Sequence, residues 1–121
     1  MMFSSPSYAE WIRVGEDIEG NIFYVDAATI KKQNGYIYWW VLQDWLKPTQ
    51  NGMFSGQIYF QGSCSAFRYR IFSDRYFNQP MGRGAIVESS NTPEKQWSYP
   101  KKNSSGMDSL IFQKVCNAVG K

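Results

Sequence analysis

The residue types that usually perform catalysis or bind metals are sparse in this sequence. It contains no histidine, which is the commonest general base and the commonest metal ligand in proteins. A serine or cysteine nucleophile would therefore lack its usual base, and two cysteines without histidine make a poor zinc set. Asp26 and Asp44 could act as a carboxylate pair, but Asp26 is placed to cap a turn and Asp44 to end a strand. The sequence therefore predicts no enzyme, no metal site and no cofactor.

Arginines are the best candidates for ligand contact. Arg68 and Arg70 alternate with aromatic residues in a strand-like segment, so both should lie on one face of a sheet. The candidate cationic residues are Arg68, Arg70, Arg75 and Arg83, followed by a second cluster of Lys101 and Lys102. They could form an ordinary solvated surface screened by salt, or a patch for an acidic partner segment or a sulfated glycan. A net charge of +3 is too small for a dedicated nucleic-acid-binding protein.

Aromatic residues are unusually frequent, with five Trp, eight Tyr and eight Phe making up 17% of the chain. Such residues favour strands, so the composition indicates a β-rich protein. We expect most of them in the core. If Tyr59 or Trp45 is exposed beside Tyr36, Tyr38 and Trp40, that surface could stack on a sugar or form a dimer interface.

Cys64 and Cys116 could be two buried free thiols or a single disulfide of an exported protein. Ser7-Tyr8-Ala9 has small residues at the first and third positions, as a signal-peptidase site requires. We therefore expect residues 1–9 to be the remnant of a signal peptide or a disordered N-terminus, and residues 10–119 to form a single domain. No apolar run approaches the length of about 20 residues that a membrane span needs.

The elements that must position these residues are strands followed by one helix. Residues 35–45 predict a central strand, since apolar groups occupy both of its faces and Asn34-Gly35 is a hairpin signal. Further strands are expected at residues 10–14, 21–25, 53–62 and 65–75, with a polar hairpin loop at residues 31–35.

The segment of residues 76–103 is broken by prolines and glycines, so no long regular element is expected there. Gly82-x-Gly84 is too short for a phosphate-binding loop and predicts a turn. Trp97 and Tyr99 could add a short last strand, and residues 85–92 could instead be mobile.

A C-terminal helix is predicted from an apolar stripe. The stripe comprises Met107, Leu110, Ile111, Lys114, Val115, Ala118 and Val119. Ser105 and Asp108 have capping-box spacing, and Gly120 can end the helix. Antiparallel strands closed by one amphipathic helix indicate an α+β fold, with a sheet of about six strands and the helix packed on one face.

An ordered set of segments resembles the surface-adhesin protein E family of small exported bacterial proteins. The segments are Glu10-Trp11, Phe23-Tyr24-Val25-Asp26, Tyr38-Trp39-Trp40-Val41-Leu42, Met81-Gly82-Arg83-Gly84 and Trp97-Ser98-Tyr99-Pro100, together with Cys64 and Cys116. The resemblance covers residues 10–117. It implies a six-stranded antiparallel sheet, a C-terminal helix and a Cys64–Cys116 disulfide that joins them. It also implies a surface or periplasmic location and an adhesin that binds vitronectin and laminin.

Taken together, the sequence and the resemblance predict a non-enzymatic, adhesin-like binding module that is secreted, periplasmic or at the cell surface. Its partner would be an extracellular protein such as vitronectin or laminin. A structural or assembly component of the cell envelope, which could form a homodimer, is the first alternative. A small glycan-binding module is the second.

Overall fold

The structure, a computed structural model, describes residues 9–101 and 106–119. Within these ranges it contains one antiparallel sheet of seven strands and one α-helix, which confirms the predicted α+β class. The strands are β1 (Trp11–Glu16), β2 (Ile22–Asp26), β3 (Lys31–Gln33), β4 (Tyr36–Asp44), β5 (Ser55–Ser63), β6 (Arg68–Phe77) and β7 (Ile86–Ser90). The helix is α1 (Met107–Ala118), and a short 3-10 turn, η1 (Pro80–Gly82), precedes β7. The expectations for residues 1–8, Lys102, Ser105 and Gly120 lie outside the described residues.

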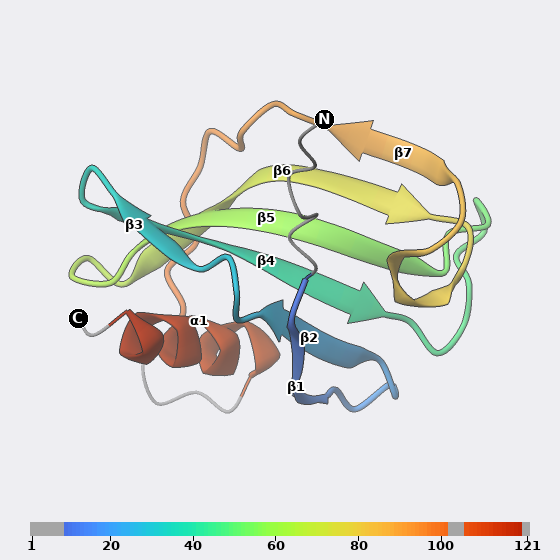
Figure 1. The fold of residues 1–121 in the computed structure, drawn as a ribbon, viewed down its shortest axis with the longest axis horizontal. Helices are drawn as coiled ribbons and strands as arrows, with labels where there is room; N and C mark the ends of the chain where they lie inside the picture. The colour runs from blue at the N-terminus through green and yellow to red at the C-terminus, as the bar shows by residue number, and fades with distance from the viewer. Residues whose placement is uncertain (1–8, 102–105, 120–121) are drawn as a thin grey trace, which may run out of the picture.

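The sheet order is β1-β2-β4-β5-β6-β7, with β3 paired to one end of β4. In Figure 1, β4 to β7 lie side by side. The helix α1 is drawn below β4, and so are β1 and β2. The central strand is β4, as predicted, and side chains are buried on both of its faces.

The predicted hairpin turn at Asn34-Gly35 is confirmed, but the predicted loop at Lys31–Gln33 is wrong. Asn34 and Gly35 have φ angles of 53° and 83°, the left-handed conformation that a two-residue hairpin turn of this type requires. Because the turn is so tight, Lys31–Gln33 is brought opposite the start of β4 and forms β3.

The core lies between α1 and the sheet. Ile111, Phe112 and Val115 are the buried apolar residues of the helix, and the Phe112 ring stacks on Trp39 at 5.5 Å. Phe112 is outside the predicted stripe, whereas Leu110 belongs to the stripe and is 43% exposed. The predicted helix is therefore confirmed, but its buried face is rotated toward Phe112.

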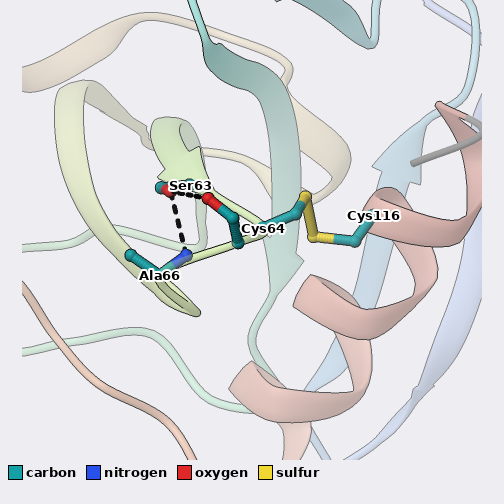
Figure 2. Close-up of a disulfide and its surroundings, with 5 residues drawn as sticks. Ser63, Cys64, Ala66 and Cys116 are labelled. Atoms are coloured by element: carbon teal, nitrogen blue, oxygen red, sulfur yellow. Dashed lines mark hydrogen bonds between the residues drawn. A yellow bond between two sulfur atoms is a disulfide. The ribbon is translucent and has the colours of Figure 1, made fainter.

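A disulfide joins Cys64 to Cys116, with the two Cα atoms 5.8 Å apart. Figure 2 shows that it links the turn after β5 to the last turns of α1. In the same turn the Ser63 hydroxyl accepts a hydrogen bond from the Ala66 N–H at 3.2 Å. The bond between sheet and helix implied by the family resemblance is thus present.

A bulge in β6 determines which of its side chains share a face. Ile71 lies opposite Phe60 and Ser73 lies opposite Tyr59, so Phe72 is an extra residue in the ladder. An extra residue resets the alternation of side chains between the two faces. Arg75 therefore lies on the same face as Arg68 and Arg70, although strict alternation from Arg70 would place it on the other.

The segment after β6 is more regular than expected. Residues 86–90 form β7, the last strand of the sheet, where a mobile segment had been the alternative. The region of Trp97 and Tyr99 is not a strand. Its backbone pairs with β6 through an isolated bridge, in which Ser98 and Tyr69 exchange hydrogen bonds of 2.7 and 3.0 Å.

Candidate ligand-binding face

The sheet face opposite α1 carries a continuous set of aromatic rings and guanidinium groups. We call it the arginine–aromatic face. It comprises Tyr36, Tyr38, Trp40, Tyr59, Arg68, Arg70, Phe72, Arg75 and Trp97. All of these side chains are half-buried except Arg75, which is exposed. The face therefore presents aromatic and cationic surface to solvent without being covered by the helix.

Trp97 organises one end of this face. The guanidinium carbons of Arg68 and Arg70 lie 4.2 and 4.7 Å from the centre of its ring, and Tyr36 stacks on it at 5.9 Å. Cation–π contacts of this kind contribute about 0.5–2 kcal/mol each, depending on how far they are desolvated.

Backbone and side-chain hydrogen bonds of Glu94 fix the approach to Trp97. Its N–H donates to the Ile71 carbonyl, and its carboxylate accepts from the Ile71 N–H, both at 2.9 Å. Its carbonyl accepts from Arg70 Nη1 at 2.9 Å. These bonds attach the segment before Trp97 to β6, where the Trp97 ring lies against Arg68 and Arg70.

Glutamine amides orient the other guanidinium nitrogens. Arg70 Nε donates to Gln61 Oε1 at 2.7 Å, and Arg75 Nε donates to Gln57 Oε1 at 2.8 Å. Gln61 in turn donates to the Tyr38 hydroxyl at 2.9 Å. Arg75 also lies 4.8 Å above the Trp40 ring. These partners are neutral, so they fix the guanidinium planes while leaving the positive charge uncompensated.

Within the described residues, no carboxylate lies within 4 Å of the guanidinium groups of this face. The ion pair found in the described part of the chain is Arg13–Glu16 at 3.3 Å, and both residues belong to β1. Arg68 Nε is buried and has no hydrogen-bond acceptor among the described residues. Burial, and then the neighbouring Tyr38, raise the pKa of Tyr59, so its hydroxyl stays protonated and adds no negative charge near neutral pH.

The structure brings together only some of the residues predicted as ligand contacts. Arg68, Arg70, Arg75 and Tyr59 share the arginine–aromatic face. Arg83 is exposed after η1, whose Gly82 lies against Gln57 near Arg75. Trp45 does not join the face: its ring stacks on Tyr76 at 5.8 Å.

Lys101 lies elsewhere, at the approach to α1. It is exposed, and its backbone carbonyl accepts a hydrogen bond from Ser109 Oγ at 2.7 Å. Lys102, the other member of the predicted lysine cluster, is outside the described residues. The lysine cluster is therefore not assigned to the arginine–aromatic face.

Trp97, Gln57 and Gln61 also contact the arginines, although the sequence did not identify them as candidate ligand contacts. Gln57, Tyr59 and Gln61 occupy every second position of β5, so their side chains lie on one face of the sheet. This spacing is the sequence signal that could have placed the glutamines beside the arginines. Trp97 carries no such signal, since its position depends on a loop that returns over β6.

The two carboxylates considered for catalysis, Asp26 and Asp44, each accept hydrogen bonds that stabilise the local backbone. Asp26 accepts hydrogen bonds from the N–H groups of Glu10 and Ala28 and from the Thr29 hydroxyl, at 2.8–3.0 Å, which confirms its predicted role as a turn cap. Asp44 accepts from the Met81 N–H at 2.9 Å. Within residues 9–101 and 106–119, no group of three or more His, Cys, Asp or Glu side chains is arranged to hold a metal ion.

The family profile of surface-adhesin protein E matches residues 11–117, which include the whole arginine–aromatic face. The chain belongs to the surface-adhesin protein E family. This membership supports a surface-adhesin role and indicates an exported or surface protein. No helix among the described residues is long and apolar enough to cross a membrane.

Solved structures of Haemophilus influenzae protein E share the fold of this family member. One matches with a TM-score of 0.70 and 14% identity, covering 99% of this chain and 95% of that one. A second crystal form gives 0.66 and 14%, covering 100% and 99%. Protein E from non-typeable Haemophilus influenzae gives 0.57 and 12%, covering 99% and 95%. A comparison with curated proteins found no match.

Proposed function

We propose that this surface-adhesin protein E family member is a non-enzymatic exported adhesion module that binds acidic segments of an extracellular protein. The binding surface is the arginine–aromatic face. The observation that carries the proposal is that Arg68, Arg70 and Arg75 lie against aromatic rings and donate hydrogen bonds to neutral groups, with no described carboxylate within 4 Å of them.

The chemistry of these side chains suits an anionic protein segment. Each guanidinium has five N–H donors, and the hydrogen bonds described above use only part of them. Charge-assisted hydrogen bonds to carboxylates are stronger than neutral ones. Since the rings and guanidinium planes are already positioned, a ligand would meet a surface that loses little conformational entropy on binding. Trp, Tyr and Arg are also the residues enriched in binding hot spots.

Vitronectin and laminin are the ligands that the family resemblance implies, and we propose them as the first to be tested. In this proposal residues 10–119 act as one binding domain, and the protein is secreted, periplasmic or displayed on the cell surface. Lys101 and Lys102 are not assigned to the binding surface.

Binding of the purified, disulfide-bonded protein to immobilised vitronectin and laminin tests the proposal. Arg68→Ala/Arg70→Ala should weaken binding at least about tenfold, since loss of one charge-assisted hydrogen bond costs about 1.5–3 kcal/mol. Lys47→Ala/Lys114→Ala is the matched control, because it removes the same charge from exposed residues elsewhere and should bind like the wild type.

Arg68→Lys/Arg70→Lys separates charge from geometry. Lysine keeps the charge but lacks the planar donor group, so this variant should remain several-fold weaker than the wild type. Equal binding by all variants would contradict the proposed surface. Competition by a heparin fragment would instead favour the glycan-binding alternative.

A second candidate function, assembly of a cell-envelope structure, is favoured by β7. This strand ends the sheet order, all five of its residues are exposed, and Ile86 and Val87 are 53% and 43% exposed. An exposed apolar edge strand can pair with a second copy across a two-fold axis. In this case analytical ultracentrifugation should find a dimer that Val87→Lys disrupts and Arg68→Ala/Arg70→Ala preserves. A monomer at all accessible concentrations would exclude such a homodimer.

A further inference from the structure

Two arginines of the arginine–aromatic face are each fixed by the glutamine directly opposite in the β5–β6 ladder. Arg70 lies opposite Gln61 and donates to its Oε1 through Nε at 2.7 Å. Arg75 lies opposite Gln57 and donates in the same way at 2.8 Å. The two glutamines are therefore the anchor points of these guanidinium groups.

The distance between the anchor points is set by β5. Gln57 and Gln61 are four residues apart in that strand, and a strand advances about 3.3 Å per residue, so the anchor points lie about 13 Å apart along the sheet. The extra residue of the ladder belongs to β6, where Phe72 is the bulge. Five positions of β6 therefore fit the same span, which brings Arg70 and Arg75 to one face.

The surface between the anchor points is aromatic. Tyr59 lies midway between the two glutamines of β5, and its ring stacks on Tyr38 at 5.9 Å and makes a T-shaped contact with Phe72 at 6.1 Å. Tyr59 and Phe72 are half-buried, so part of each ring is accessible. A ligand that spans the two anchor points would cross these rings.

Positive charge is greatest at the Gln61 end of the span. Arg68 and Arg70 contact the same tryptophan ring there. Lys31 pairs across the ladder with Tyr38, which pairs in turn with Gln61, and the lysine Nζ lies 5.6 Å from the centre of the Tyr38 ring. This end can therefore attract an acidic side chain strongly, while Arg75 provides a separate contact at the other end.

We infer that the face selects an extended protein segment with two acidic side chains four residues apart and an aromatic or aliphatic side chain midway between them. The inference rests on the proposed function, since it specifies which acidic segments this surface binds. In an extended chain, residues four apart lie on the same side and about 13 Å from each other. One carboxylate then meets Arg70, the other meets Arg75, and the side chain between them packs on Tyr59.

An α-helical ligand matches this span less well. A helix rises about 1.5 Å per residue, so about nine residues would be needed to cover the distance between the anchor points, and residues nine apart lie on opposite sides of a helix. The spacing therefore favours an extended chain.

Contact with both ends is what makes the surface selective. An exposed ion pair contributes little by itself, so a segment that reaches one end only would bind weakly. When one segment carries both carboxylates, the second contact forms within the complex and costs less entropy than a separate binding event. Acidic residues at another spacing would leave one of the two guanidinium groups without a carboxylate.

Synthetic peptides with blocked ends test the spacing, with titrations followed by nuclear magnetic resonance to measure weak dissociation constants. The first peptide has two glutamates four residues apart, a tyrosine midway and serines elsewhere. The second has the same composition with the two glutamates adjacent, so net charge and unspecific attraction are equal. The first should bind at least about fivefold more tightly, the scale of one additional charge-assisted contact. Replacing its tyrosine by serine should weaken it severalfold.

Arg75→Ala removes one end of the span and leaves the other unchanged. Because Arg75 is exposed, this variant should fold like the wild type, which circular dichroism checks. The advantage of the first peptide should fall below about twofold, while the adjacent-glutamate peptide should bind as it does to the wild type. Lys47→Ala/Lys114→Ala is the matched control and should preserve both dissociation constants.

Three results would overturn the inference. Equal binding of the two peptides by the wild type would mean that the face recognises charge without spacing, and the proposed function would stand. An unchanged preference in Arg75→Ala would place the recognition of spacing elsewhere. Binding of neither peptide would contradict the inference as well, and the assay with immobilised vitronectin and laminin would then decide the proposed function separately.

Discussion

Arg68, Arg70 and Arg75 differ from ordinary surface arginines in what their guanidinium groups contact. Two of them share the Trp97 ring, and the third covers Trp40. The alternation of β6 was enough to predict that Arg68 and Arg70 share a face. It could not place Arg75, since the Phe72 bulge is set by the register against β5 and has no signal in the sequence of β6 itself.

Gly62 lies in a closely packed part of the core, beneath the helix. A methyl group there would lie 2.8 Å from atoms of both Phe112 and Trp39. Gly62→Ala should therefore lower the free energy of unfolding by about 1–3 kcal/mol, the usual cost of overpacking a core. Urea unfolding followed by circular dichroism measures this loss.

Gly15→Ala is the matched control for that substitution. Its methyl group would meet only the flexible end of Met107, at 3.2 Å, so the free energy of unfolding should change by less than about 1 kcal/mol. Equal destabilisation by the two variants would show that the Gly62 contact has no special role.

Ionisation of Tyr76 should lower the free energy of unfolding at alkaline pH. Burial, followed by the nearby Asp74 carboxylate, raises the pKa of Tyr76 to about 12, against about 10 in an unfolded chain. Below pH 10 both states keep the proton. As the pH rises from about 10 toward 12, the unfolded state loses it first, so the free energy of unfolding falls.

Urea unfolding between pH 9 and about 11 should therefore show a steeper decline for the wild type than for Tyr76→Phe. Asp74→Asn, which removes the carboxylate that raises this pKa, should give an intermediate slope. Parallel declines in all three proteins would contradict the assignment to Tyr76.

The elements differ in how far their sequences predicted them. The central strand, the hairpin at Asn34-Gly35 and the C-terminal helix carry strong local patterns, and all three were predicted. The buried face of α1 was misjudged by one position, because Phe112 fits the space left by Gly62 beside Trp39. That space is created by tertiary packing and is invisible in helical periodicity.

β7 was missed for a related reason. Sequence patterns identify strands from the alternation of a buried face with an exposed one, and all five residues of β7 are exposed. The strand exists because its backbone pairs with β6, and that pairing leaves no apolar alternation to detect.

The Cys64–Cys116 disulfide ties α1 to the sheet across 52 residues of chain. Cys64→Ala/Cys116→Ala should lower the free energy of unfolding by about 4 kcal/mol, since an open loop of that size gives the unfolded chain more conformational entropy. Denaturant unfolding measures the loss. The wild type in strong reductant should match the variant, and a difference of less than about 1 kcal/mol between oxidised and reduced wild type would show that the helix holds without the bond.

At the scale of the whole molecule, the sheet separates two environments. One face packs against α1 to form the core, and the other carries the uncompensated arginines. Composition, element order and family resemblance predicted this architecture. They did not predict that Arg75 and Trp97 join Arg68 and Arg70 on that face, because the net charge of +3 says nothing about its distribution over the surface.

Because the charge is concentrated on one face, ligand binding should weaken as salt rises. The dissociation constant for vitronectin or laminin should increase steadily between low salt and physiological ionic strength, where the screening length falls to about 8 Å. Arg68→Ala/Arg70→Ala should show a shallower dependence, while Lys47→Ala/Lys114→Ala should follow the wild type. Equal salt dependence in all three would contradict a localised electrostatic site.

Oxidative footprinting of the protein, free and bound to vitronectin or laminin, tests most directly whether the arginine–aromatic face is the binding surface. Bound ligand should protect Trp97, Trp40 and Tyr59 from oxidation, while Leu110 on α1 and Ile86 on β7 should react as in the free protein. Protection of Leu110 or Ile86, with Trp97 and Tyr59 unchanged, would contradict it.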